Sequence, residues 1–161
     1  MGVVYRKKKA APTQQVYLTP EEIKSRYTDW FDPSPHPRPA WDGLQVSWGE
    51  RAFCNPPWCN IRPWVEKALQ ERDKGCVVHM LIPPATSTAT WHDLIFPQAS
   101  QIIFLRRYTP YLRVSDGKTV AMPSCIVTFD VPDILKAARP QVQENALHLS
   151  AQRLRGAALR W

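Results

Sequence analysis

The chain has 161 residues, of which 44% are hydrophobic and seven are tryptophan, so it fits one domain with a real core and is not a disordered chain. Its formal net charge of +7 favours a polyanionic partner, with simple solubility as the other explanation. No apolar run is long enough to cross a bilayer and the N-terminus lacks a secretory signal, so we expect a cytoplasmic protein that contacts no membrane.

Residues 1–15 contain an Arg-Lys-Lys-Lys run and no apolar period, which predicts a flexible basic arm. Such an arm either lies along a nucleic-acid backbone or is a solvated tail, and the sequence favours neither. A helix is predicted from Thr19, a good N-cap, through Pro20, which suits the first helical position, to about Tyr27.

Residues 30–32 are predicted as the first strand, which Pro33 stops. Ligand-binding residues gather where the strands of a parallel α/β sheet end, so Asp32 is placed at the ligand edge. Asp42 precedes Gly43, a pair that is also typical of an ordinary turn.

A second short strand ends abruptly in Asn55-Pro56-Pro57-Trp58. Proline cannot continue a sheet, and each proline pushes the residue before it away from helical angles, so this segment is predicted to be a stiff, extended loop. The amide oxygen of Asn55 and a neighbouring backbone carbonyl form a pair of acceptors that suits an exocyclic amino group. The indole of Trp58 can lie against the flat face of a base.

The pattern beyond this loop predicts a helix over residues 61–74, with Lys67 and Glu71 on its solvent side, then a buried strand over 76–82 and a helix capped by Thr88 or Thr90. A strand over 101–105 and a hairpin with its turn at Asp116-Gly117 follow. The run 123–129 is predicted to be an antiparallel strand near the sheet edge. Residues 133–161 are predicted to be a helical tail that packs on the domain or joins two copies of the protein.

Basic and aromatic residues alternate at Arg106, Arg107 and Tyr108. This pattern suits the retention of a single strand or a flipped nucleotide, and an exposed hairpin with ordinary charges explains it equally well. The four cysteines have no paired-motif spacing, which indicates reduced core thiols and no metal site.

The loop and the motifs around it, in their order and spacing, resemble the small phage-type DNA N6-adenine methyltransferase family (Dam-like). The motifs are Tyr17-Leu18-Thr19-Pro20, Phe31-Asp32-Pro33-Ser34-Pro35, Asp42-Gly43-Leu44, Trp48, Asn55-Pro56-Pro57-Trp58 and Trp64-Val65-Glu66-Lys67-Ala68. The resemblance covers roughly residues 16–130 and implies a catalytic domain over 16–132. It also implies an α/β fold: a compact Rossmann-like sheet, mostly parallel with an antiparallel edge strand, and helices on both faces.

The resemblance implies transfer of a methyl group from S-adenosylmethionine to the N6 amine of a flipped or unpaired adenine in DNA, in the host cytoplasm if the chain is phage-encoded. The implied catalytic residues are Asn55, Pro56, Pro57 and Trp58. The implied cofactor-binding residues are Thr19, Pro20, Asp32, Pro33, Ser34, Asp42 and Asn55. The implied substrate-binding residues are Phe53, Trp58, Thr86, Arg106, Arg107 and Tyr108.

The chain departs from the better-known methyltransferase pattern, because Asp32-Pro33-Ser34-Pro35 stands where most members have a glycine-rich turn. The chain is also short for a separate target-recognition domain, which favours relaxed specificity or single-stranded DNA. These departures keep a second class open, a catalytically inactive methyltransferase-like protein that binds nucleic acid or serves assembly. Cytosine N4 is the alternative target, because the same acceptor pair would orient its amino group.

Overall fold

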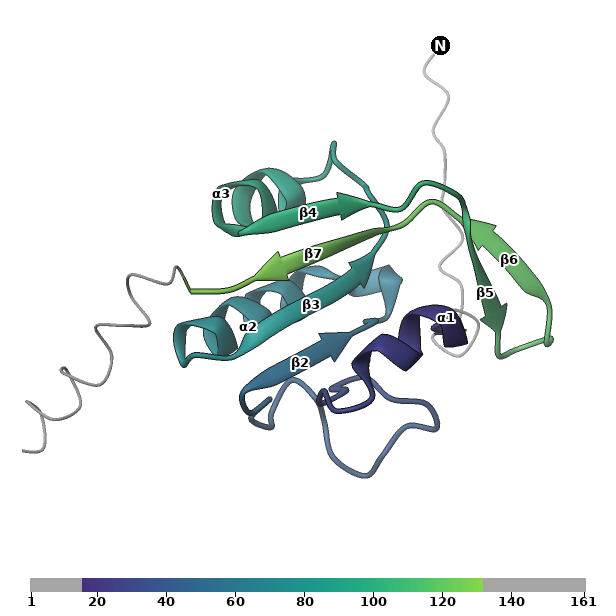
Figure 1. Cartoon of the computed structure of the whole chain (residues 1–161), viewed down its shortest axis with the longest axis horizontal. Coiled ribbons are helices and arrows are strands. Elements are labelled where there is room, and N and C mark those ends of the chain that lie inside the picture. Colours follow the sequence, from purple (N-terminus) through teal and green to yellow (C-terminus); the bar gives the residue numbers. More distant parts are fainter. Residues whose placement is uncertain (1–15, 132–161) are drawn as a thin grey trace, which may run out of the picture. The chain divides into compact units, whose positions relative to one another are not determined.

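The computed structural model describes residues 16–131 (Figure 1). The arm predicted over residues 1–15 and the helical tail predicted over 133–161 lie outside the described residues. Between residues 16 and 131, no helix is both long and apolar enough to span a membrane.

A four-stranded sheet carries the core, with the strand order β2-β3-β7-β4. Its strands are β2 (Arg51–Cys54), β3 (Val77–Ile82), β7 (Cys125–Phe129) and β4 (Gln101–Phe104). Strands β2 and β3 are parallel, with Ala52 opposite Val78, whereas β7 is antiparallel to both β3 and β4. Phe31 forms a single parallel bridge to Ala52 on the other side of β2.

The prediction of a Rossmann-like, mostly parallel sheet with an antiparallel edge strand is therefore wrong. The antiparallel strand β7 was predicted with the right direction, but it lies between β3 and β4 and so makes two of the three strand pairs antiparallel. The strand predicted over residues 30–32 is reduced to the bridge at Phe31, and Pro33 prevents it from continuing.

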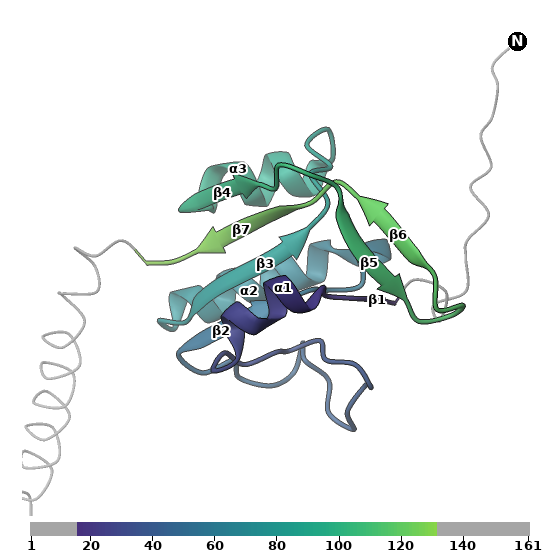
Figure 2. The same cartoon turned by 45° about the vertical axis from the view of Figure 1, so that its right-hand side comes forward.

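A second, three-stranded antiparallel sheet has the order β1-β5-β6 and lies beside the carboxyl ends of β2 and β3 (Figure 2). It consists of β1 (Tyr17–Leu18), β5 (Thr109–Arg113) and β6 (Thr119–Met122). The predicted hairpin is confirmed: Gly117 has a φ of 66°, which glycine adopts without strain, and Arg113 pairs with Asp116.

The helical segments of residues 16–131 are few and mostly short. They are α1 (Glu21–Lys24) with a 3-10 turn at Ser25–Tyr27, a 3-10 turn at Trp58–Asn60, α2 (Arg62–Asp73), and a π-helical turn at Trp91–Ile95 that continues into α3 (Phe96–Gln98). The predicted layers of helices on both faces are thus absent from this part of the chain. A long helix, α2, and the Trp91 segment cover one face, and β1, α1 and the β5–β6 hairpin contribute to the cover of the other.

Side chains alternate between these two faces, as they must along a strand. Ala52 and Cys54 of β2 pack in the core beneath α2, whereas Phe53 packs in the second core with Leu81 and Tyr111. Asn55 follows β2 directly, so its side chain points to the same side of the sheet as that of Phe53. This is the side on which the second sheet lies.

Candidate active site

Three neighbours fix the carboxamide of Asn55. Its Nδ2 donates to the backbone carbonyl of Tyr17 at 3.0 Å and to Oγ1 of Thr19 at 3.1 Å, while its Oδ1 accepts from Nε1 of Trp58 at 3.2 Å. The opposite rotamer would place the amide oxygen against the Tyr17 carbonyl, which can only accept, and the NH₂ group against the Trp58 N–H, which can only donate, so these two neighbours determine the orientation. Both amide hydrogens are engaged, and Oδ1 retains one lone pair.

The prolines shape the loop that carries this side chain. Pro56 is buried and stops β2, and Pro57 is extended, with φ −60° and ψ 115°, before the 3-10 turn that begins at Trp58. Among the described residues, no donor binds the carbonyl of Pro56, whereas that of Pro57 accepts from the amide of Asn60 at 3.2 Å. Asn55 Oδ1 and the Pro56 carbonyl are thus two acceptors with unused capacity at adjacent positions.

Two tyrosines frame Trp58. The ring centroids of Trp58 and Tyr111 are 5.0 Å apart in an edge-to-face arrangement, and those of Trp58 and Tyr17 are 5.9 Å apart. Tyr111 is fully buried, its hydroxyl lies 2.8 Å from Oγ of Ser124, and burial raises its pKa to about 12, so it remains neutral. Trp58 is only partly buried, so a fixed indole with some solvent contact stands beside Asn55.

Phe53, predicted to bind substrate, is instead engaged in packing. It is 4% exposed, and its ring stacks on Tyr27 with centroids 3.9 Å apart. The Tyr27 hydroxyl lies 3.0 Å from Nδ1 of His79, whose pKa is lowered by burial. Of the two aromatic residues predicted to stack on a base, Trp58 is the one whose ring is partly open.

Thr19 does not cap the first helix, contrary to the cap prediction. Helix α1 begins at Glu21 with Pro20 at its N-cap, no side chain caps it, and the Pro20 carbonyl accepts the first helical hydrogen bonds. Thr19 directly follows β1, and its hydroxyl oxygen accepts from Nδ2 of Asn55 instead. The threonine is thereby tied to the Asn55 loop.

Asp32 lies beside the carboxyl end of β2. It follows the bridge at Phe31, and its Oδ1 accepts from the amide of Ser34 at 2.9 Å. Burial raises the pKa of Asp32, and the Ser34 hydrogen bond and the charge of Lys24 oppose that rise. The charge of Asp32 adds to burial in raising the pKa of the Cys54 thiol, which shows that the carboxylate lies near the residue before Asn55.

Asp42 is brought close to Asp32 by a backbone contact. A Cβ at Gly43 would lie 1.8 Å from the carbonyl oxygen of Pro33, so only glycine permits the two segments to touch. Asp42 is exposed, and its Oδ1 accepts from the amide of Leu44 at 3.0 Å, as in an ordinary turn. Within residues 16–131, the second carboxylate oxygen of Asp32 and that of Asp42 have no hydrogen-bond partner.

The remaining predicted substrate-binding residues are not joined to this site. Thr86, Arg106, Arg107 and Tyr108 are exposed, Tyr108 by 68%. No hydrogen bond, ion pair or ring contact links them to Asn55 or Trp58 in the described part of the chain. Thr90 occupies the N-cap position of the Trp91–Ile95 segment, but its side chain makes no capping hydrogen bond, and Thr88 donates its hydroxyl to the Ala85 carbonyl at 2.9 Å.

The cysteines form no cluster with other ligands. Cys54, Cys76 and Cys125 are buried and reduced, and Cys59 is exposed. Over residues 16–131 there is no group of three or more His, Cys, Asp or Glu side chains that could hold a metal ion.

Comparison with protein families gives one result. The model of the family described as DNA N-6-adenine-methyltransferase (Dam) matches residues 39–129, more than half of the chain. The matched segment contains Asp42 and the Asn55 loop, and it begins after Thr19 and Asp32. No curated protein and no solved structure matched the chain.

Proposed function

Because the chain belongs to the DNA N-6-adenine-methyltransferase (Dam) family, we propose that it transfers a methyl group from S-adenosylmethionine to N6 of an adenine held by the Asn55 loop. The observation that carries this proposal is the fixed orientation of the Asn55 amide. Its two hydrogens are engaged by Tyr17 and Thr19, so only its oxygen is left to meet a substrate.

The N6 amine of adenine is a poor nucleophile because its lone pair is delocalised into the ring. Asn55 Oδ1 and the Pro56 carbonyl accept the two N6 hydrogens, which favours a pyramidal nitrogen whose lone pair points away from both acceptors. Orientation and preorganised acceptors therefore account for most of the rate enhancement, and no covalent intermediate with the protein is needed.

The residues at the carboxyl end of β2 have the chemistry that the cofactor requires. S-adenosylmethionine supplies an electrophilic methyl group on a positively charged sulfonium. Burial disfavours the charged form of Asp32, so a cationic ligand beside this carboxylate is favourable. Asp42 is suited to accept hydrogen bonds from ribose hydroxyls, and Thr19, Pro20, Pro33 and Ser34 complete the proposed cofactor-binding set.

A base inside a duplex cannot reach such a loop, so the adenine must be flipped out or already unpaired. Trp58 is the residue proposed to stack on it, held in place by Tyr111 and Asn55. Arg106, Arg107 and Tyr108 are proposed to hold the DNA backbone, which suits their exposure.

Substitution of Asn55 tests this function. We expect Asn55→Ala to lower methyl transfer by about 10²–10³-fold, the usual cost of removing a preorganised polar group, and to change cofactor affinity by less than about threefold. Transfer is measured with labelled cofactor and DNA, and affinity by calorimetry. Asn60→Ala is the matched control, because Asn60 is exposed in the same 3-10 turn. An unchanged rate in Asn55→Ala would remove Asn55 from the mechanism.

Nucleoside analysis of the methylated DNA identifies the target. N6-methyladenine supports the proposal, whereas N4-methylcytosine would assign the same loop to cytosine. If the wild-type chain neither binds S-adenosylmethionine nor methylates any DNA, it is a catalytically inactive member of the family. The Asp32-Pro33-Ser34-Pro35 segment, without a glycine-rich turn, is the feature that favours this second candidate.

A further inference from the structure

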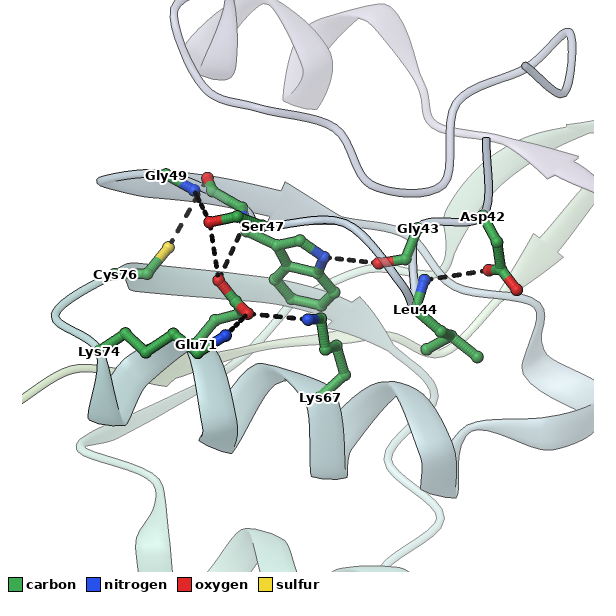
Figure 3. A network of polar contacts seen from close by, with 10 residues as sticks. Asp42, Gly43, Leu44, Ser47, Gly49, Lys67, Glu71, Lys74 and Cys76 are labelled. Carbon is green, nitrogen blue, oxygen red and sulfur yellow. Dashed lines mark hydrogen bonds and ion pairs between the residues drawn. The ribbon is translucent and has the colours of Figure 1, made fainter. Parts of the chain in front are cut away.

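A buried ion cluster on α2 lies outside the Asn55 site. Glu71 is 1% exposed, and its Oε1 pairs with Nζ of Lys67 at 2.8 Å and Nζ of Lys74 at 2.7 Å (Figure 3). Its Oε2 accepts from the backbone amide of Trp48 at 3.0 Å. Burial acts to raise the pKa of Glu71, but these hydrogen bonds outweigh it and lower the pKa to about 2, so the carboxylate stays charged.

Trp48 connects this cluster to the loop before β2. Its side chain is 1% exposed, and its Nε1 donates to the carbonyl of Gly43 at 2.8 Å. In Figure 3, Glu71 lies at one end of this polar network, and Gly43, next to Asp42, lies at the other. The backbone of Trp48 is thus held by α2 while its side chain holds Gly43.

Gly43 in turn lies against Pro33, where any Cβ would meet the Pro33 carbonyl oxygen at 1.8 Å. In the sequence, Pro33 directly follows Asp32 and Gly43 directly follows Asp42. The contact between Pro33 and Gly43 therefore lies next to both proposed cofactor carboxylates. Residues 35–41 between them form no hydrogen bond with the rest of the described chain. The Gly43 contact and the stacking of Trp41 on Phe31, with ring centroids 5.5 Å apart, therefore hold this loop in position.

We propose that Glu71 and Trp48 are positioning residues for the cofactor site, acting through Gly43 to hold Asp32 and Asp42 in place. This inference rests on the proposed function. It assigns a role in cofactor binding to two residues that touch neither cofactor nor DNA. A cluster that served stability alone would leave cofactor affinity unchanged once the protein is folded.

Trp48→Phe separates these roles, because it keeps an aromatic ring in the core and removes the N–H that binds Gly43. Trp91→Phe is the matched control: Trp91 is 2% exposed in the same core, and its indole makes no hydrogen bond within residues 16–131. The readouts are the Kd of S-adenosylhomocysteine by calorimetry, the KM for S-adenosylmethionine with kcat, and thermal unfolding.

We expect Trp48→Phe to weaken S-adenosylhomocysteine binding about tenfold, as for loss of one buried hydrogen bond, and to raise KM by more than it lowers kcat. Trp91→Phe should lower the unfolding temperature by about as much as Trp48→Phe does. It should change the Kd of S-adenosylhomocysteine by less than about twofold. Equal Kd values for Trp48→Phe, Trp91→Phe and wild type would overturn the proposal.

Gly43→Ala provides a second test that leaves Glu71 and Trp48 unchanged. The added Cβ forces the Pro33 and Gly43 segments apart, so cofactor binding should fall while the protein remains folded. Unchanged binding in Gly43→Ala would overturn the positioning role even if Trp48→Phe fails to fold. A wild-type chain that binds no S-adenosylhomocysteine would overturn the proposed function as well, whereas normal wild-type binding with unaffected variants would overturn the positioning role alone.

Discussion

At the scale of single residues, the site depends on contacts between segments far apart in the sequence. Asn55 is held by Tyr17 and Thr19, which lie 38 and 36 positions before it. Motif spacing predicted the Asn55-Pro56-Pro57-Trp58 loop as an acceptor site. It gave no indication of Tyr17 or Tyr111 as neighbours of Trp58, because ring contacts between separate elements leave no local pattern.

Substitution of Thr19 tests whether its hydroxyl orients the amide. Thr19→Val keeps the shape of the side chain but removes the acceptor for Asn55 Nδ2, so we expect a roughly tenfold loss of the single-turnover methyl-transfer rate. Thr19→Ser retains the hydroxyl and should stay within about threefold of wild type. A loss confined to cofactor affinity would leave Thr19 its proposed cofactor-binding role and remove it from the orientation of Asn55.

At the scale of elements, α2 illustrates where periodicity misleads. Residues 61–74 were predicted as a helix, and α2 spans Arg62–Asp73, but the assignment of Lys67 and Glu71 to the solvent side is wrong because both are buried. Their burial depends on a partner outside the helix, the amide of Trp48, and helical spacing carries no information about it. Thr19 failed as a cap for a similar reason, since Asn55 competes for its side chain.

The ion cluster predicts how stability depends on pH. Glu71 has a folded-state pKa of about 2, below its ordinary value of 4.5. Its contribution to the free energy of unfolding is therefore complete above pH 4.5 and is lost as the pH falls from 4.5 towards 2. We expect this loss to be about 2 kcal/mol of unfolding free energy after allowance for the exposed Lys74. Urea unfolding of wild type and Glu71→Gln across this range measures it, and the variant should show a flatter dependence.

Glu66→Gln is the control for that experiment. Glu66 lies on the same helix, with an exposed side chain that pairs with Arg62 at 3.0 Å. Exposed pairs contribute little, so its substitution should change stability by less than about 0.5 kcal/mol at any pH. If Glu71→Gln and wild type lose stability in parallel on acidification, Glu71 is not the group that titrates.

At the scale of the whole molecule, the net charge of +7 and a DNA substrate predict that the affinity for DNA falls as the salt concentration rises. Arg106 and Arg107 are exposed at the start of the β5–β6 hairpin. If both contact phosphates, replacing them together with alanine should reduce the slope of log Kobs against log salt by about 1.4 on single-stranded DNA and about 1.8 on duplex DNA. Fluorescence anisotropy with single-stranded and duplex DNA measures this slope.

Arg62→Ala is the appropriate comparison for the DNA experiment. Arg62 is also exposed, but it is already paired with Glu66 and Asp93. Its substitution should leave the slope unchanged. A slope that responds equally to both changes would indicate a non-specific effect of net charge and remove Arg106 and Arg107 from the proposed DNA surface.

Local patterns predicted most of the strands but not their arrangement. The apolar runs at 76–82, 101–105 and 123–129 correspond to β3, β4 and β7. Strand order is decided by pairings between distant segments, so the interior place of β7 was not visible in its sequence. Strand β1 has two residues, too few for an alternating pattern to be recognised.

The interior place of β7 has a consequence for synthesis on the ribosome. Strands β3 and β4 do not pair with each other, and β7 lies between them and pairs with both. During translation, β3 can pair with β2 as soon as both have emerged, whereas β4 has no partner in this sheet until Cys125–Phe129 has left the exit tunnel. The four-stranded sheet is therefore completed by the last of its strands to be made.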